Sequence, residues 1–408
     1  MARQRDAFRI ILLGALTILV LVKVSMRYLL SLVIFLFSTA GVASSAHSAE
    51  PLKIGLSMAL TGKYAALGDL SLKAYKLWEA DVNKRGGILG RSVTLVVYDD
   101  KSDPATASEI YKKLILVDKV DLVFGPYASD ITEAVAPVTE QYGYPLLASG
   151  AAADVLWQKG YKYLFGVFIT ASKYTVGFLE VLVNNGFDKV AVITADDLFS
   201  RSIAKGTKAW ATRFDLDVVF FEEFRKDAKS LDEIVKRAEQ SGAQALIVCG
   251  HMDESINARI ALKNTGWSPR AYYATVGPAV QKFHDVLKDD ADYTFSSSQW
   301  EPSSPFPGAK EFAAAFSKAY RKMPSYHAAN AYAAGQILES AIRKAKSTDR
   351  AKVRDVLASL DTITIIGRYG VDATGKQVRH FATTVQWQKG KKESVAPPEI
   401  VTAMPLWR

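Results

Sequence analysis

The chain has one cysteine among its 408 residues, Cys249, so it can form no internal disulfide. A folded chain of this kind needs a large enough apolar core, and 49% apolar residues can supply one large or two medium cores. Cys249 ends the apolar run Ala245–Cys249, which predicts a buried strand. We therefore expect a structural thiol and not a nucleophile.

Clustered positive charge is also missing, although the formal net charge is +9. Residues 1–49 hold five basic side chains and one acidic one, which leaves 46 basic and 41 acidic side chains, a net +5, for the rest. No long basic run occurs in that part, so a nucleic-acid surface is not expected. With 14 prolines and 26 glycines, the composition also excludes a collagenous or largely disordered chain.

Signatures of catalysis are sparse. The sequence has no phosphate loop and no Gly-x-Ser-x-Gly elbow, and its Gly86-Gly87 pair does not open a helix after a strand. Adjacent carboxylates at Asp99-Asp100 and Asp196-Asp197 follow strand-like runs, where they either serve a site or hold loops. The five histidines are His47, His251, His284, His327 and His380. None of them has a second potential ligand at metal-binding spacing, so we expect that the protein is not an enzyme and binds no metal or cofactor.

The N-terminus reads as an export leader over residues 1–49. Two apolar blocks, Ile10–Val22 and Tyr28–Ala43, are each shorter than the roughly 18–20 residues that span a bilayer. The second block follows Met26-Arg27 and ends in small residues, which favours cleavage after Ala46, with Ala49 as the alternative. Met26 is a candidate for the true start. An uncleaved anchor would bury Lys23 and Arg27 in the bilayer, at a cost of a few kcal/mol.

From residue 52 onward, short β-branched runs alternate with helical patterns. This alternation predicts parallel sheets covered by helices on both faces, and eight strands before residue 280 predict two lobes. The strands are expected at Lys53–Met58, Val93–Tyr98, Val120–Phe124, Pro145–Ala148, Lys189–Thr194, Val218–Phe221, Ala245–Cys249 and Tyr272–Thr275. Later helices at Tyr326–Ala345 and Lys352–Leu360, with strands at Ile363–Ile366 and Ala382–Gln388, are expected to pack back onto both lobes.

Two turns after strands are suited to binding an anion. Ser129 lies where a strand ends and a helix begins, so backbone N–H groups without helical partners are expected beside it. Simple capping of the helix by Ser129 is the alternative. The run Ser149-Gly150-Ala151-Ala152 repeats the arrangement after the next strand, with small side chains that let a ligand approach the backbone.

These elements together resemble the type I periplasmic solute-binding proteins, the leucine/isoleucine/valine-binding-protein-like receptors of ABC importers. The similarity rests on Thr61-Gly62, the run Asn83–Arg91, Asp99-Asp100, the Gly-Pro-x-x-Ser turn at 125–129 and Ala328–Leu338, and it extends from Leu52 to Trp387.

The resemblance implies two Rossmann-like lobes with parallel sheets, joined by three crossovers and a hinge, that close on a ligand. The lobes are expected at 50–169 plus 299–368 and at 170–298 plus 369–408. The crossovers are expected near Phe168–Lys173, Phe295–Trp300 and Gly367–Val371.

The resemblance also implies ligand-binding residues. Ser129 matches the family's carboxylate-binding serine, Ser149 to Ala152 match the second carboxylate-binding loop, and Glu254 matches the acid that holds the ligand's ammonium group. This sequence departs from the family at Ala152, where a hydroxyl is expected, at Leu198-Phe199, where Tyr-Gly is usual, and at Leu67, where an aromatic is common. Fewer hydroxyls favour a hydrophobic or aromatic carboxylate, with aromatic lining drawn from Tyr64, Tyr127, Phe168, Tyr174, Phe199 and Trp300.

The resulting hypothesis is a monomeric periplasmic binding protein that delivers an amino acid or a related carboxylate to a membrane permease. Its expected ligand-binding residues are Tyr64, Tyr127, Ser129, Ser149, Gly150, Ala151, Phe199 and Glu254. A ligand-sensing ectodomain or regulator on the same lobes, and a binder of amides or urea, stay open as alternatives. A hydrolase is disfavoured, because no nucleophile–base set is visible.

Overall fold

The computed structural model describes residues 13, 14, 18, 19, 21–23 and 50–408, which belong to two units, 1–49 and 50–408. The few described residues of the first unit are helical. Met26 and the predicted cleavage sites lie outside the described residues. No helix among the described residues combines the length and the apolarity needed to cross a membrane.

The unit 50–408 contains a first sheet of five parallel strands in the order β2-β1-β3-β4-β5. Near-continuous apolar strands such as β1 are buried because helices cover both faces of a parallel sheet. The strands are β1 (Leu52–Met58), β2 (Val93–Asp99), β3 (Leu122–Phe124), β4 (Leu146–Ala148) and β5 (Leu164–Gly166).

A second sheet of seven strands has the order β14-β13-β10-β9-β8-β6-β7. Its strands from β6 to β10 run parallel, and the last two strands of the chain join one edge in antiparallel pairing. The strands are β6 (Lys189–Ala195), β7 (Asp217–Phe224), β8 (Ala245–Cys249), β9 (Ala271–Ala274), β10 (Thr294–Ser298), β13 (Thr383–Gln388) and β14 (Lys391–Ala396), while β11 (Thr362–Thr364) and β12 (Gly367–Tyr369) form a separate hairpin.

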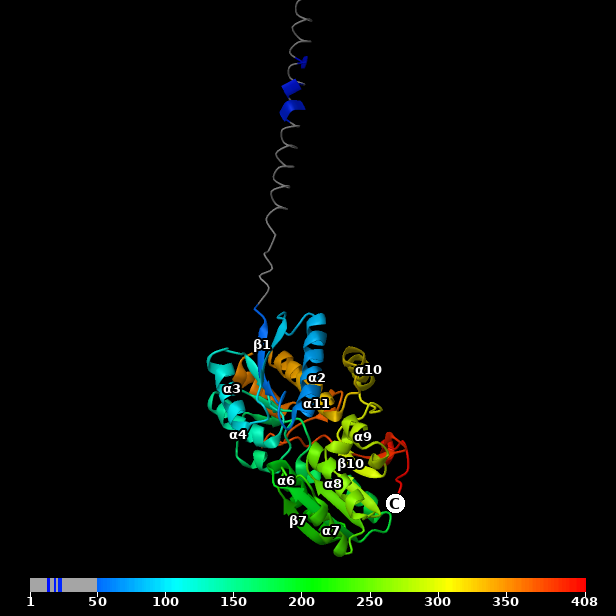
Figure 1. The fold of residues 1–408 in the computed structure, drawn as a ribbon. Coiled ribbons are helices and arrows are strands. Elements are labelled where there is room, and N and C mark those ends of the chain that lie inside the picture. The colour runs from blue at the N-terminus through cyan, green and yellow to red at the C-terminus, as the bar shows by residue number, and fades with distance from the viewer. Residues whose placement is uncertain (1–12, 15–17, 20, 24–49) are drawn as a thin grey trace, which may run out of the picture. The chain divides into compact units, whose positions relative to one another are not determined.

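Helices lie around each sheet, and Figure 1 shows α2, α3, α4 and α11 beside β1 and α6, α7 and α8 near β7. The long helix α11 returns late in the sequence to pack along α2. The helices are α2 (Ala65–Lys84), α3 (Pro104–Leu116), α4 (Ser129–Gln141), α5 (Val176–Val183), α6 (Leu198–Arg213), α7 (Asp232–Gln240), α8 (Met252–Thr265), α9 (Gln281–Leu287), α10 (Ala309–Tyr320), α11 (Tyr326–Ala345) and α12 (Arg350–Ser359).

Local chemistry explains where several elements begin and end. The Asp103 side chain accepts a hydrogen bond from the Thr106 N–H, and Pro104 occupies the first position of α3, which together fix that helix start. After α2, Gly87 has φ 76° and packs so closely that an added Cβ would lie 1.9 Å from the Arg91 carbonyl oxygen. The glycine run of the sequence is therefore the tight turn that leads α2 into β2.

Three connections link the two sheets, as predicted, but the third is later than expected. The first follows β5 and the second follows Ser298, the end of β10. Residues 367–369 are still in the β11–β12 hairpin, and the Gly166 N–H at the end of β5 donates to the Gly375 carbonyl. The segment that leads from this hairpin to β13 therefore runs from Gly370 to Ala382, so the predicted crossover at Gly367–Val371 begins inside β12.

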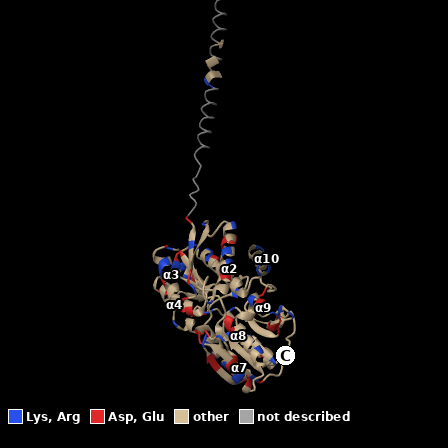
Figure 2. Cartoon of the chain, in the orientation of Figure 1, with Lys and Arg blue, Asp and Glu red and all other residues tan. Residues whose placement is uncertain are grey.

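Opposite charges are interspersed over the unit 50–408 rather than gathered by sign (Figure 2). Ion pairs such as Arg201–Glu223 and Arg237–Glu222 lie on exposed helix and strand surfaces. Pairs of this kind contribute little to stability. The buried strand predicted for Cys249 is confirmed as β8, where burial raises the pKa of the thiol well above its usual value.

Candidate functional site

A narrow cavity of about 10 Å³, close to the volume that one water molecule needs, lies where the carboxyl ends of strands from both sheets meet. In parallel α/β sheets this edge is where loops and helix starts gather, and where ligands bind. The lining comes from residues that follow β3, β4 and β5 of the first sheet, β6, β8 and β9 of the second, and from the start of α11. These residues are Tyr127, Ala128, Ser129, Gly150, Ala152, Phe168, Tyr174, Phe199, His251, Val276, Tyr326 and His327.

The start of α4 presents polar hydrogens to this cavity. Ser129 is the first residue of the helix, with Ala128 in the capping position, and no protein oxygen in the described chain accepts from the N–H groups of residues 129–131. The Ser129 hydroxyl oxygen instead accepts from the Ala152 and Ala153 N–H groups, each at 3.1 Å. Its own hydrogen is left to donate. This arrangement suits a carboxylate.

Backbone strain occurs on both sides of the cavity. Ala128 has φ 85° and ψ 148°, a region that is otherwise occupied almost only by glycine. Val276, on the opposite side, has φ 61° and ψ −63°, the centre of a three-residue turn closed by the Gly277 N–H and the Thr275 carbonyl. Each conformation costs about 1–3 kcal/mol, and such strain concentrates at functional sites.

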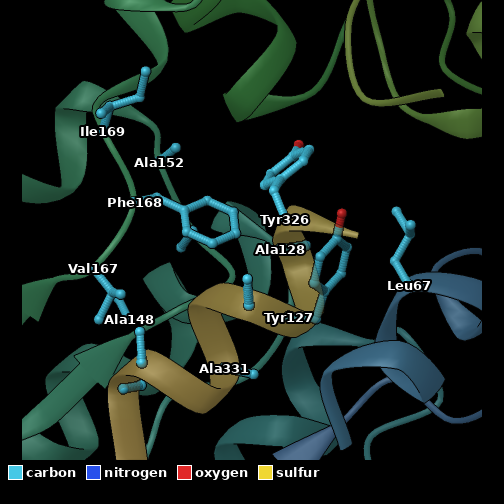
Figure 3. Close-up of a cluster of buried hydrophobic side chains, with 14 of the residues drawn as sticks. Leu67, Tyr127, Ala128, Ala148, Ala152, Val167, Phe168, Ile169, Tyr326 and Ala331 are labelled. Atoms are coloured by element: carbon cyan, nitrogen blue, oxygen red, sulfur yellow. The ribbon is translucent and has the colours of Figure 1, made fainter. Parts of the chain in front are cut away.

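Aromatic side chains form most of the cavity wall. Phe168 packs against Tyr326 at 5.6 Å between ring centroids, and Tyr174 meets Phe199 edge-on at 5.3 Å. Figure 3 shows the hydroxyl groups of Tyr127 and Tyr326 pointing in the same direction, with the Phe168 ring beside Tyr326. The wall therefore combines ring faces for an apolar ligand body with a few hydroxyl groups.

His251 connects the cavity to a buried acid. Its Nε2 lies 3.4 Å from an oxygen of Asp197, which also caps α6 by accepting from the Ser200 N–H. Burial opposes the charged form of His251, but Asp197 outweighs it and raises the pKa of the imidazole. Burial also opposes the charged form of Asp197, yet His251 and Ser200 hold the pKa of that carboxyl well below its usual range. Each partner therefore favours the charged form of the other.

His327 is the neutral counterpart. Its Nε2 lies 3.2 Å from the Tyr127 hydroxyl, and the ring is 1% exposed. Burial, with repulsion from His251, lowers the pKa of His327 to about 3. The surroundings of the cavity thus shift its two imidazoles in opposite directions, with the pKa of His251 raised and that of His327 lowered.

The lowered pKa of His327 predicts a loss of stability in mild acid. In the unfolded chain His327 binds a proton below about pH 6.5, whereas in the folded chain it stays neutral down to about pH 3. The free energy of unfolding therefore decreases as the pH falls below about 6.5. Between pH 7 and pH 5, the free energy of unfolding of His327→Gln should fall by about 2 kcal/mol less than that of wild type. Urea unfolding at both pH values measures the difference. His380 and Asp100 also have shifted pKa values, but both residues are present in wild type and variant, so their contributions cancel in the comparison. Parallel pH profiles of the two proteins would contradict this assignment.

Four of the eight predicted ligand-binding residues line the cavity: Tyr127, Ser129, Gly150 and Phe199. Tyr64 lies one layer behind, with its ring 5.7 Å from Tyr127 and 4.9 Å from His251. Ala151 is buried but is not part of the lining.

The remaining two predicted residues have protein partners elsewhere. The Ser149 hydroxyl bonds to that of Tyr75, 2.5 Å away. Glu254 pairs with Lys63 at 2.6 Å and lines a more open hollow with Lys63, Lys226 and Lys229. Of the six predicted aromatic residues, Trp300 packs on Phe312 and does not line the cavity.

The sequence patterns did not predict His251, Val276, Tyr326 or His327 as ligand-binding residues. The signal available was position, because each follows a strand or opens a helix at the same edge as Ser129. The paired acids separate into two roles. Asp99 accepts from the N–H groups of residues 60, 61 and 101 and so holds a loop, whereas Asp197 holds His251 at the cavity.

Contacts between elements of the two sheets close over the cavity. The Leu198 N–H, at the start of α6, donates to an oxygen of Asp130 in α4 at 3.2 Å. Asp154 accepts from the Ser202 hydroxyl at 2.8 Å, and the Lys63–Glu254 pair makes a third link. These three contacts hold together elements of the two sheets near the cavity.

Comparisons with known proteins agree with this fold. A family model described as periplasmic binding protein matches residues 51–392. The Leu/Ile/Val-binding protein homolog 7 of Brucella suis biovar 1 is 26% identical over 87% of this chain and 94% of its own length. Homolog 8 of the same organism is 27% identical over 91% of this chain and 96% of its own length.

Among solved structures, LivJ from Streptococcus pneumoniae in complex with isoleucine superposes with a TM-score of 0.76 at 24% identity, covering 85% of this chain and all (100%) of LivJ. A solute-binding protein of an ABC transporter from Rhodopseudomonas palustris BisB5, in complex with 3,4-dihydroxybenzoic acid, gives 0.75 at 19% identity, covering 84% and 95%. The predicted fold class is confirmed. With a family model that spans most of its length, the chain belongs to the periplasmic binding protein family, among its type I, leucine/isoleucine/valine-binding-protein-like members.

Proposed function

We propose that this chain is the substrate-binding component of an ABC importer, which captures an amino acid or a related small carboxylate and delivers it to a membrane permease. The observation that carries the proposal is the enclosed cavity at the carboxyl ends of both sheets, where N–H groups of residues 129–131 have no protein acceptor. Helix N-terminal amides of this kind hold carboxylates without needing a positive side chain. The same proposal includes export by a cleaved leader and action as a periplasmic monomer.

We propose further that each sheet forms the centre of one lobe and that the ligand enters when the lobes separate. The hydrogen bond from Gly166 to Gly375 favours extending the predicted first lobe from residue 368 to residue 377. The lobes are then 50–169 plus 299–377 and 170–298 plus 378–408. The contacts of Asp130, Asp154 and Lys63 across the cavity are those that opening would break.

The relatives support a small organic acid as ligand. Isoleucine and 3,4-dihydroxybenzoic acid, the ligands named for two of the similar structures, share a carboxylate attached to a compact apolar body. The aromatic wall of this cavity suits the apolar body of such a ligand, and its volume of about 10 Å³ requires the lobes to separate before the ligand fits.

A thermal-shift screen of amino acids, aromatic acids, amides and urea tests the proposal. A true ligand at a hundred times its Kd should stabilise the folded protein by about 2.7 kcal/mol and raise Tm accordingly. A stabilising response to amides or urea alone would favour the alternative ligand class. No response to any small carboxylate or amide would contradict the proposal.

Ser129→Ala should weaken binding of the best carboxylate by about 1–3 kcal/mol. The change removes a hydroxyl donor and leaves the Ala152 and Ala153 N–H groups without their acceptor. Titration calorimetry on wild type and variant measures the difference.

Ser149→Ala is the matched control, since it also removes a buried hydroxyl that faces Tyr75. We expect its Kd to stay within a factor of about two of wild type, although Tm falls. Equal losses of affinity in both variants would show that the effect is a general loosening of the loops.

A further inference from the structure

Both oxygens of the Glu254 carboxylate are bound within the chain. One lies 2.6 Å from the Lys63 ammonium nitrogen, and the other accepts from the backbone N–H of His251 at 2.9 Å. The Glu254 side chain is 4% exposed, so few further partners can reach it. The resemblance to the family assigned this acid to the ammonium group of the ligand, and here an ammonium group of the protein occupies that role.

Lys63 is held in place from two directions. It lies in the turn between β1 and α2, and its ammonium also donates to the Lys226 carbonyl at 3.1 Å. Glu254 opens α8, which follows a strand of the other sheet, so the pair bridges elements 191 residues apart. A charged link between the two halves is therefore present without any contribution from a ligand.

The cavity itself offers no acid. Among its twelve lining residues in the described chain, none is aspartate or glutamate. Asp197 lies behind His251 and is paired with it, and Asp130 binds the Leu198 N–H and lies 3.7 Å from Lys226. An α-ammonium group enclosed here would lack a counter-charge, which is costly in a buried site.

We propose that Lys63 replaces the ligand's ammonium group, so that this protein selects small carboxylic acids that carry no α-amino group. This inference rests on the proposed function and narrows its substrate class to acids with an aromatic or branched aliphatic body. Lys63 acts as the specificity-determining residue by occupying Glu254, while the start of α4 receives the carboxylate.

Matched pairs of ligands test this on the wild-type protein. Titration calorimetry would compare 3-phenylpropionate with L-phenylalanine and 4-methylpentanoate with L-leucine, which differ only in the α-amino group. For whichever pair contains a ligand of this protein, we expect the acid without the amino group to bind at least about tenfold tighter than the corresponding amino acid. Amino acids that bind as tightly as their partners would overturn the inference and leave the proposed function standing. Absence of binding by any small carboxylate would overturn both.

Lys63→Met should raise the affinity for the amino acid relative to its partner by at least about tenfold, because Glu254 loses its internal counter-charge. Lys63→Arg keeps the pair and should retain the wild-type ratio. Lys229→Met removes a positive charge from the same hollow without touching the Lys63–Glu254 pair, and should also retain it. A ratio that stays constant in Lys63→Met, or that shifts equally in Lys229→Met, would overturn the role of Lys63.

Discussion

Asp197→Ala should destabilise the folded chain by about 3–5 kcal/mol at pH 6, because it leaves the buried His251 without its counter-charge. The same change removes the cap of α6, since the Asp197 oxygens accept from both the N–H and the hydroxyl of Ser200. Urea unfolding of wild type and variant measures the loss.

The size of this loss should depend on pH. The lowered pKa of Asp197 gives stability that is present above about pH 4 and is lost in acid. The raised pKa of His251 gives stability that is complete below about pH 6.5 and is lost as the pH rises through its folded value. The loss should therefore be largest between about pH 4 and pH 6.5.

Asp197→Asn is the matched control, because its side-chain oxygen can still cap α6 while the charge is gone. We expect a smaller loss than for alanine, with the same direction of pH dependence. A cost below about 1 kcal/mol for Asp197→Ala, or one that does not vary with pH, would show that the pair is not charged in the folded protein.

Gly335→Val should destabilise the protein by about 3 kcal/mol or more, because α11 and α2 touch at this residue. An added Cβ would lie 2.3 Å from the indole ring of Trp78, whose side chain is completely buried. Helix propensity alone predicts the opposite sign, since replacing a helical glycine by alanine gains up to about 1 kcal/mol. Unfolding of Gly335→Ala and Gly335→Val therefore tests which effect prevails.

A second-site change separates the clash from other causes. Trp78→Phe removes part of the ring that the new side chain would meet. We expect the double variant Trp78→Phe with Gly335→Val to lose less stability than the two single variants together. Additive losses would indicate that the helices accommodate the valine by moving apart.

Strong local patterns made most of the fold predictable. The apolar run Ala245–Cys249 is β8 as predicted, and Lys53–Met58 lies within β1. The strands β5 and β10 were not predicted, because Leu164–Gly166 is very short and β10 contains Ser296, Ser297 and Ser298 in a buried position. Those serines are tolerated since their hydroxyls bond to backbone oxygens, a compensation that only the folded chain shows.

The candidate site was predictable where function follows from position along the chain. Ser129 and Gly150 follow strands of one sheet, and the edge they share is a general property of parallel sheets. Contacts between side chains that are far apart in the sequence could not be predicted from local patterns. Nothing near Glu254 in the sequence indicates that Lys63 would bind it, and nothing near Asp197 indicates His251.

The most direct test of the binding site is a crystal structure with the acid that gives the largest thermal shift. The ligand should lie in the enclosed cavity, with its carboxylate against the N–H groups of residues 129–131 and the hydroxyl of Ser129, and with Lys63 still on Glu254. A ligand bound outside this cavity, or one whose carboxylate points away from the start of α4, would contradict the proposed mode of capture.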